Sequence, residues 1–490
     1  MIINPLFAKD MYKVGHHRMY PEGTTLLFSN FTPRRSRLPG IDHSVFFGLK
    51  YFLKMYLQEY FNHYVFSQDP YSLAIGYQYI IDHTLGEQPE AKHMSDLVKL
   101  GHLPIAIHAL PEGAIVPCGV PALVMYNTHP DFFWLPNMLE TLISCTLWGA
   151  CTAATIARQN RLILDGFARL TSDIPEFVDY QAHDFSMRGM FGLEASILAG
   201  LAHLHYFKGS DSMPAILANE RYYDNPINIS SVPATEHSVM SAYGKENELE
   251  CYRHLITEVH PEGMISIVSD TYDLWNVIEN YLPALRDEIL NRDGTVIIRP
   301  DSGDPVDILC GYDLVRWRSM GRGYINLQNG KSDDDSPSRK GLIECLWDIF
   351  GGHINTKGYK QLDPHIGVIY GDSITTDRCR DICQRLQDKG FASTNCVFGV
   401  GSYSYQYHTR DSLGWAMKTT YAEINGKGVA IYKDPITDDG TKRSHRGLLK
   451  VVNVEGAHGS TYQVLENQTW EQFRQDDNEL QLVFEDGRLV

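Results

Sequence analysis

Four short runs of apolar residues, each ending in charged or small residues, constrain the fold of this chain most strongly. The runs are ISIVSDTYD at 265–273, VIIRPDSGD at 296–304, HIGVIYGDS at 365–373 and NCVFGVGSY at 395–403. Residues 271–290 and 374–390, which follow the first and third runs, repeat apolar residues at helical spacing. Strands that alternate with helices predict βαβ units and a parallel sheet, either open or closed into a barrel.

The polar ends of these strands predict where the active groups lie. In a parallel sheet or barrel, active groups gather at the carboxyl ends of the strands. The charges of RPDSGD should therefore meet, on one rim, the residues Ser269, Asp270, Asp273, Gly371 and Asp372 and the glycines of FGVGS. Such a rim suits a phosphorylated sugar, because arginine binds phosphate oxygens, glycine lets backbone N–H groups approach an anion, and aspartates bind ribose hydroxyls or Mg²⁺. The alternative is that each Arg–Asp pair is a structural ion pair.

The remaining segments predict a second domain. Residues 136–415 read as the barrel-like domain, in which 139–170 has helical periodicity over one long or two shorter helices. Residues 1–135 mix strand-like and helical pieces, and residues 416–490 are β-rich with an Asn425-Gly426 hairpin signal. We expect the two end segments to pack together as one β-rich α+β domain.

Composition excludes several classes of protein. The chain has 490 residues, is 43% hydrophobic and 21% charged, and carries a net charge of -17 spread along its length, which disfavours a nucleic-acid partner. Its nine cysteines include no Cys-x-x-Cys pair and look like free thiols in a reducing compartment. The opening MIINPLFAKDMYK lacks the features of a signal peptide, and no uninterrupted apolar run approaches membrane-spanning length. We therefore expect a soluble cytoplasmic protein.

Three further segments contain candidate site residues, and each segment alone is weak evidence for a site. Phe185 and Arg188 in FVDYQAHDFSMRGMFG could hold a flat polar ring. Asp211 ends HYFKGSD, which otherwise reads as an ordinary helix stop, and Ser231 and His237 lie in SVPATEHS. His237 could act as a general base or as a nucleophile toward phosphate, although most histidines in such a chain are ordinary surface or core residues. The short histidine pairs lack a third ligand, so a zinc site is not expected.

In this order, several segments together resemble the nicotinamide phosphoribosyltransferases, a family of type II phosphoribosyltransferases. The segments are DMYKVGHHRMYP, HDFSMRG, FKGSD, SVPATEHS, VSDTYD, IIRPDSGDP, YGD, FGVGS, TRD and KDP, and they extend from about residue 10 to about residue 447. The resemblance implies an irregular α/β barrel with a β-rich second domain. It also implies a homodimer with shared active sites.

The resemblance assigns the pyridine site to three residues. Nicotinamide would stack between Phe185 and Tyr12 of the partner subunit, with Asp10 in the same cross-subunit segment. Asp211 would accept a hydrogen bond from the carboxamide N–H₂. A carboxylate at that position accepts a hydrogen bond from an amide but repels the carboxylate of nicotinate, so it distinguishes the two pyridines by charge.

The resemblance also assigns the sugar-phosphate site. Catalytic roles fall to His237, Asp301 and Arg299, and no metal-ligand set is assigned. Other substrate-binding roles fall to Arg188, Ser231, Ser269, Asp273, Gly371, Asp372, Gly401, Ser402 and Arg410, and, near the pyrophosphate and across the dimer, to Lys418, Lys433 and Lys442.

The implied reaction transfers a phosphoribosyl group. The ring nitrogen of nicotinamide displaces pyrophosphate at C1 of phosphoribosyl pyrophosphate through a transition state with oxocarbenium character. Positioning and cationic groups, including Mg²⁺, would supply most of the catalysis, and ATP would act as a co-substrate by phosphorylating His237. Two features depart from the family pattern: Ser402 stands where a second glycine is expected, and a polar insertion, which we expect on the surface, occupies 329–341. The rival hypotheses are a nicotinate phosphoribosyltransferase and a non-catalytic binding protein on the same fold.

Overall fold

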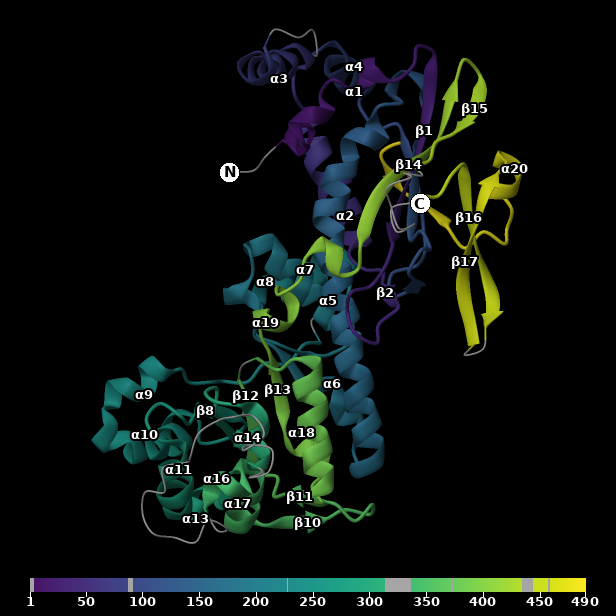
Figure 1. The fold of residues 1–490 in the computed structure, drawn as a ribbon. Helices are drawn as coiled ribbons and strands as arrows, with labels where there is room; N and C mark the ends of the chain where they lie inside the picture. Colours follow the sequence, from purple (N-terminus) through teal and green to yellow (C-terminus); the bar gives the residue numbers. More distant parts are fainter. Residues whose placement is uncertain are drawn as a thin grey trace. The chain divides into compact units, whose positions relative to one another are not determined.

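The computed structural model describes residues 4–86, 91–226, 228–312, 336–371, 373–433, 444–456 and 459–490, and these form two compact units (Figure 1). Unit 1 comprises residues 1–155, 220–224 and 408–490, and unit 2 comprises residues 156–219 and 225–407. Of the predicted site residues, Asp372 and Lys442 lie outside the described residues.

Unit 1 is built on one sheet that mixes strands from both ends of the chain. Its order is β15-β14-β1-β5-β3-β18-β19. The strands are β1 (Thr24–Pro33), β3 (Ile105–Ala109), β5 (Leu123–Asn127), β14 (Trp415–Ile424), β15 (Lys427–Ala430), β18 (Gln481–Glu485) and β19 (Arg488–Leu489). The predicted second domain built from the N- and C-terminal segments is thus confirmed. Asn425 and Gly426 both have positive φ, at 50° and 71°, and they make the predicted hairpin turn between β14 and β15.

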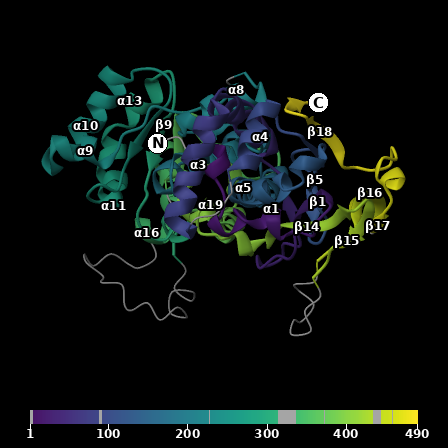
Figure 2. The ribbon, with the colours of Figure 1, turned by 90° about the horizontal axis from the view of Figure 1, so that it is seen from above.

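Helices and two smaller strand pairs complete unit 1. The helices are α1 (His16–Met19), α2 (Leu49–Phe52), α3 (Pro70–Leu85), α4 (Lys92–Leu100) and α20 (Trp470–Phe473). The pairs are β2 (His43–Val45) with β4 (Ile115–Pro117), and β16 (Leu448–Gly456) with β17 (Gly459–Gln468); the second pair forms a hairpin well apart from α3 and α4 (Figure 2). The core of the unit is aromatic: Phe31 stacks on buried Trp415 with ring centroids 4.4 Å apart.

A single helix, α5 (Leu135–Thr171), occupies the region for which one long or two shorter helices were predicted. Its residues belong to unit 1 up to Thr155 and to unit 2 from Ile156. The helix is long and apolar enough to cross a membrane, but 67% of its most apolar window is buried inside the protein, as expected of a core helix.

Unit 2 is built on six parallel strands in the order β7-β6-β13-β12-β9-β8. The strands are β6 (Ala182–Asp184), β7 (Gly209–Ser210), β8 (Ile265–Val268), β9 (Val296–Arg299), β12 (Ile366–Tyr370) and β13 (Val397–Val400). The irregular segment 230–235 lies between the two edge strands: Ser230 bridges Gly209 of β7, and Ala234 bridges Ser266 of β8, both in parallel. The sheet is therefore closed into an irregular barrel, one of the two forms that the sequence left open.

Helices connect these strands as the sequence predicts. They are α6 (Val178–Gln181), α7 (Leu193–Leu204), α8 (Met213–Tyr223), α9 (His237–Tyr243), α10 (Glu248–His254), α11 (Leu274–Asn276), α12 (Leu282–Ala284), α13 (Arg286–Asn291), α14 (Pro305–Cys310), α16 (Pro337–Lys340), α17 (Leu342–Phe350), α18 (Thr376–Asp388) and α19 (Ser402–Tyr405), with a small pair of strands, β10 (Gly352–Ile354) and β11 (Lys360–Leu362). Within the predicted helix at 271–290, Pro283 lacks an N–H and the helix is divided into shorter pieces. α18 ends at Asp388, two residues before Gly390, whose φ of 76° suits a helix stop.

Two other expectations can be compared with the described residues. All nine cysteines are free thiols. Of the insertion at 329–341, residues 329–335 lie outside the described residues, while Pro337–Lys340 forms α16 and Gly341 is buried.

Candidate active site

The predicted site residues of unit 2 follow the carboxyl ends of the barrel strands. Phe185 and Arg188 follow β6, Asp211 follows β7, and Ser231 and His237 lie on or directly after the closing segment. The loops after β8, β9, β12 and β13 begin at Ser269, Pro300, Gly371 and Gly401, respectively. The strand topology therefore brings these residues to one rim, because all carboxyl ends of a parallel barrel lie on the same side.

One cluster on the rim surrounds Asp211. Its Oδ1 accepts a hydrogen bond from His183 Nε2 at 2.8 Å and another from Ser231 Oγ at 2.6 Å. Burial acts to raise the pKa of Asp211, but the hydrogen bonds from His183 and Ser231 and the charge of Arg299 outweigh it and hold the pKa below its ordinary value. Asp211 is therefore an ionised hydrogen-bond acceptor near neutral pH.

The ring of Phe185 lies beside this cluster. Its centroid is 4.7 Å from that of His183, and its backbone N–H donates to Val400 O at 3.0 Å. A Cβ added at Gly399 would lie 2.7 Å from Phe185 Cδ2, so this glycine leaves room for the ring. Ser402, which departs from the family pattern, packs close to Gly189 in the loop that follows Phe185: a Cβ at Gly189 would lie 2.0 Å from its Oγ.

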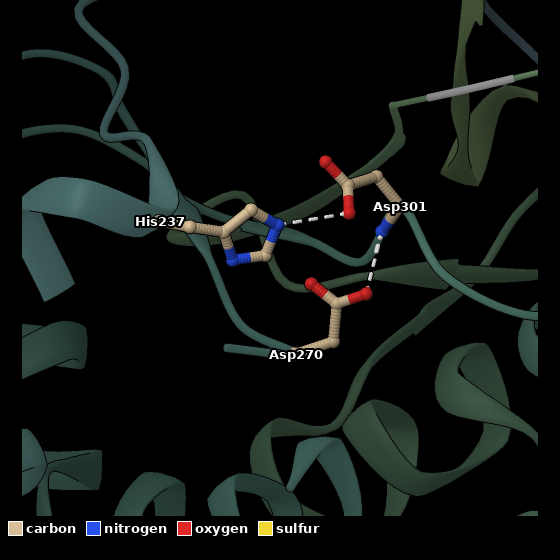
Figure 3. Close-up of side chains that lie close together, drawn as sticks. All are labelled: His237, Asp270 and Asp301. Carbon is tan, nitrogen blue, oxygen red and sulfur yellow. Dashed lines mark hydrogen bonds and ion pairs between the residues drawn. The ribbon is translucent and has the colours of Figure 1, made fainter. Parts of the chain in front are cut away.

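A second cluster joins His237, Asp270 and Asp301 (Figure 3). His237 Nε2 lies 3.1 Å from Asp301 Oδ1, and His237 Nδ1 lies 3.0 Å from Thr271 Oγ1. Because the carboxylate of Asp301 can only accept, Nε2 carries a proton, and in the neutral ring Nδ1 then holds the lone pair.

Asp270 holds the loop that bears Asp301. Its Oδ2 accepts from the backbone N–H of Asp301 at 3.0 Å and from that of Ser302 at 2.7 Å, while its buried Oδ1 has no partner among the described residues. Gly371 N–H donates to Pro300 O at 3.0 Å on the other side of the same loop. The RPDSGDP loop is thus fixed by side chains and backbone from two neighbouring strands.

Arg299 connects the two clusters electrostatically. Burial lowers its pKa, and Asp301, Asp270 and Asp211 oppose that change. Its guanidinium donates to Thr235 O, and one of its nitrogens lies 4.0 Å from Asp301 Oδ2. A half-buried guanidinium close to three carboxylates can bind a phosphate while its own charge remains compensated.

The second cluster also fits a divalent cation. Ligand atoms of His237, Asp270 and Asp301 all lie within 4.8 Å of one another. Mg²⁺ is usually held by one or two carboxylates together with substrate phosphates. The free Oδ1 of Asp270 and the oxygens of Asp301 suit that ion.

The side chains of two predicted site residues are hydrogen-bonded within the protein. Ser269 is fully buried, and its hydroxyl donates to Ile267 O at 2.7 Å. Asp273 caps α11 by accepting from Trp275 N at 3.0 Å and from Asn276 N at 3.2 Å. Both side chains stabilise the loop after β8.

Lys418 and Lys433, which were predicted to lie near the pyrophosphate, belong to unit 1, where a cavity of about 470 Å³ is found. Lys418 and Lys433 line it together with Arg34, Arg35 and Arg37. Burial lowers the pKa of Lys418, and the charges of Arg34 and Arg410 lower it further, as expected where several cations gather. The sequence reasoning missed the three arginines, although the run RRSR at 34–37 was a visible signal.

Asp10 and Tyr12 lie on a segment of unit 1 that α5 holds in place. Thr141 Oγ1 donates to Asp10 Oδ2 at 2.8 Å, and Lys13 Nζ donates to Glu140 Oε2 at 2.9 Å. Between these anchors, Tyr12 is 65% exposed. The structure therefore divides the predicted site residues into two groups, one in each unit.

Comparison with known proteins gives the family. The model of the nicotinate phosphoribosyltransferase family matches residues 180–482, and the model of the nicotinamide phosphoribosyltransferase N-terminal domain matches residues 4–72. The chain belongs to the nicotinate phosphoribosyltransferase family.

Relatives in this family match nearly the whole chain. A nicotinamide phosphoribosyltransferase from Acinetobacter baylyi is 43% identical over 99% of this chain and 94% of its own length. One from Xanthomonas campestris is 33% identical over 99% of this chain and 95% of its own length.

Two solved structures share the fold. Human nicotinic acid phosphoribosyltransferase matches with a TM-score of 0.55 and 16% identity over 99% of this chain and 89% of that chain. Nicotinate-nucleotide pyrophosphorylase from Pyrococcus furiosus matches with a TM-score of 0.55 and 14% identity over 99% and 91% of the two chains. The predicted barrel of type II phosphoribosyltransferases is therefore confirmed.

Proposed function

We propose that this protein is a nicotinamide phosphoribosyltransferase, which converts nicotinamide and phosphoribosyl pyrophosphate into nicotinamide mononucleotide and pyrophosphate in NAD salvage. The observation that carries the proposal is the ionised Asp211, which is hydrogen-bonded to His183, whose ring lies against Phe185, on the same barrel rim as Arg299 and Asp301. A fixed negative charge next to an aromatic face selects a neutral pyridine with an amide donor over a carboxylate.

Side chains on the rim hold the sugar phosphate in position. Arg299 and Arg188 bind phosphate oxygens, Asp301 and Gly371 lie along the ribose, and Asp372 and Ser402 complete the donor site. The lone pair of the pyridine nitrogen then attacks C1 as the bond from C1 to the pyrophosphate oxygen breaks. No proton has to be transferred, so the chain acts by holding the two reactants in line and by neutralising charge on the departing pyrophosphate.

Mg²⁺ fits this chemistry. Asp270 and Asp301 would hold it, and when bound it supplies positive charge to the pyrophosphate. The carboxylate of Asp301 also accepts a hydrogen bond from His237 Nε2.

ATP is proposed as a co-substrate that phosphorylates His237. The lone pair at Nδ1 attacks the γ-phosphorus, a P–N bond forms, and the bond to the departing ADP oxygen breaks. Asp301, 3.1 Å from Nε2, stabilises the positive charge that the ring acquires. A phosphate at this position adds negative charge that favours cation binding in the donor site.

The active site is proposed to be shared in a cytoplasmic homodimer. Tyr12 is 65% exposed on unit 1, and Phe191, close after Arg188, is 87% exposed on unit 2. Apolar side chains with such exposure suit an interface between two copies. The cavity lined by Lys418 and Lys433, with Lys442 nearby in sequence, would then bind pyrophosphate next to the partner's rim, and Arg410 would bind the 5′-phosphate.

A direct assay tests the proposal. The protein is incubated with phosphoribosyl pyrophosphate, Mg²⁺ and either nicotinamide or nicotinate, with and without ATP, and the mononucleotide is separated by chromatography. We expect nicotinamide mononucleotide and a loss of the preference for nicotinamide in Asp211→Asn. A preference for nicotinate would support the rival enzyme. Turnover of neither pyridine, with calorimetric binding of phosphoribosyl pyrophosphate, would support a binding protein.

A further inference from the structure

Both hydrogen bonds to the Asp211 carboxylate converge on one oxygen. His183 Nε2 and Ser231 Oγ lie 2.8 Å and 2.6 Å from Oδ1. Within the described part of the chain, no hydrogen bond reaches Oδ2. Because rotation of the carboxylate would break two bonds at once, Oδ1 is held against the protein and Oδ2 is left to accept from a ligand.

The barrel is built to place His183 there. His183 lies on β6, in register with Gly209 of β7 on one side and Gly399 of β13 on the other. A Cβ at Gly209 would lie 2.8 Å from His183 Nδ1, so the glycine gives the imidazole its space. Asp211 follows Gly209 by two residues, so its side chain lies on the same face of the sheet as the side chain of His183. The His183 side chain is only 8% exposed, so its orientation is fixed by packing.

The carboxylate of Asp211 determines which nitrogen of His183 donates a hydrogen bond. An ionised carboxylate only accepts, so His183 donates from Nε2. Asp211 keeps its negative charge in this pair, and its second oxygen accepts no hydrogen bond from the described residues. That charge is what separates a carboxamide from a carboxylate.

We propose that His183 is a positioning residue for pyridine specificity, which holds Asp211 through Oδ1 so that Oδ2 is presented to the carboxamide of the substrate. The inference rests on the proposed nicotinamide phosphoribosyltransferase activity and adds a residue that does not itself bind the sugar phosphate. Without the N–H of His183, the carboxylate is held by the Ser231 hydroxyl alone, so it turns more easily and is more easily protonated. A protonated Asp211 donates to a carboxylate, so nicotinate gains as a substrate while nicotinamide loses.

Two substitutions separate the hydrogen bond from simple packing. His183→Gln places an amide N–H near the position of Nε2, whereas His183→Leu has a similar volume and no donor. We measure kcat/KM for nicotinamide and for nicotinate with both variants and the wild type, between pH 3.5 and 8.5, so that the profile extends to the range in which Asp211 is protonated. We expect His183→Gln to keep most of the preference and His183→Leu to reduce the ratio of the two kcat/KM values by about tenfold or more, the usual effect of a lost hydrogen bond to a charged group.

The pH profile gives a second readout that a structural role would not change. The groups that lower the pKa of Asp211 are His183, Ser231 and Arg299, of which His183 and Arg299 can carry charge. Since the hydrogen bond from His183 lowers the pKa of Asp211, its removal raises that pKa, and the acid limb of the nicotinamide profile should move to higher pH in His183→Leu. In His183→Gln, the acid limb should stay close to that of the wild type.

The outcomes distinguish this inference from the proposed function. A wild type that uses neither pyridine contradicts the proposed function, whatever the variants do. An active wild type whose His183→Leu variant keeps both the preference and the acid limb overturns the role of His183. Equal losses in His183→Gln and His183→Leu also overturn it, because the donor would then be irrelevant. If His183→Leu does not fold, His183→Asn replaces it, since its shorter amide does not reach Asp211, and the same comparison decides.

Discussion

Substitution of Gly399 by alanine tests the geometry of the pyridine site most directly. An added Cβ would lie 2.6 Å from Tyr370 O and 2.7 Å from Phe185 Cδ2. Carbon atoms in favourable contact are about 3.5–4.0 Å apart, so the ring or the strand backbone has to move by about 1 Å. The carbonyl of Tyr370 is part of β12, which leaves the ring as the softer partner.

The expected size of the effect follows from this displacement. Overpacking of this kind lowers the free energy of unfolding by roughly 1–3 kcal/mol. A displacement of about 1 Å at a substrate-positioning residue reduces activity by up to roughly 100-fold. We therefore expect Gly399→Ala to raise the KM for nicotinamide and to lower kcat/KM by about 10- to 100-fold.

The matched control is Gly166→Ala. Gly166 lies within α5 in the same unit, and a Cβ there meets nothing within 4 Å. This change should leave the KM for nicotinamide as it is and raise the free energy of unfolding by about 1 kcal/mol, because alanine favours a helix. Initial rates at varied nicotinamide and urea unfolding measure both quantities. Equal KM values in Gly399→Ala and Gly166→Ala would refute the argument that Gly399 makes room for Phe185.

Three other experiments test the remaining parts of the molecule. His237→Ala should abolish the stimulation of turnover by ATP, measured as the ratio of rates with and without ATP; a ratio equal to that of the wild type contradicts a phosphohistidine at this position. Glu140→Ala removes the counter-ion of Lys13, whose side chain is 3% exposed, and should lower the free energy of unfolding by on the order of 3 kcal/mol in urea; no loss would mean that the pair does not hold the Tyr12 segment. Mixing inactive Asp10→Ala with inactive Arg299→Ala chains should restore partial activity if sites are shared, whereas no recovery after demonstrated subunit exchange argues against sharing.

Local patterns predicted many of the elements and the candidate residues at the strand ends. The apolar runs with polar ends predicted the parallel strands and the rim on which their polar ends meet, because side-chain periodicity and burial follow directly from the order of residues. The Asn425-Gly426 turn was also predicted from local sequence, because both residues tolerate positive φ. Phe185, Asp211 and His237 were assigned through the resemblance of whole segments.

Other properties depend on contacts between residues far apart in the chain. Nothing local indicated that the segment 230–235 closes the barrel, since its bridges to β7 and β8 join residues of different βα units. The roles of Gly399 and Gly209 could not be predicted either, because the rings for which they make room belong to residues far away in the sequence.

The sequence by itself therefore determined the order of strands and helices, the family, and which polar residues follow each strand. The tertiary structure alone decided that His183 and Ser231 share one oxygen of Asp211, that Asp270 fixes the loop of Asp301, and that Arg34, Arg35 and Arg37 join Lys418 around one cavity. The physical reason is that strand and helix formation depend on neighbouring residues, whereas hydrogen-bond geometry and charge clustering depend on which distant side chains the closed barrel and the mixed sheet bring together.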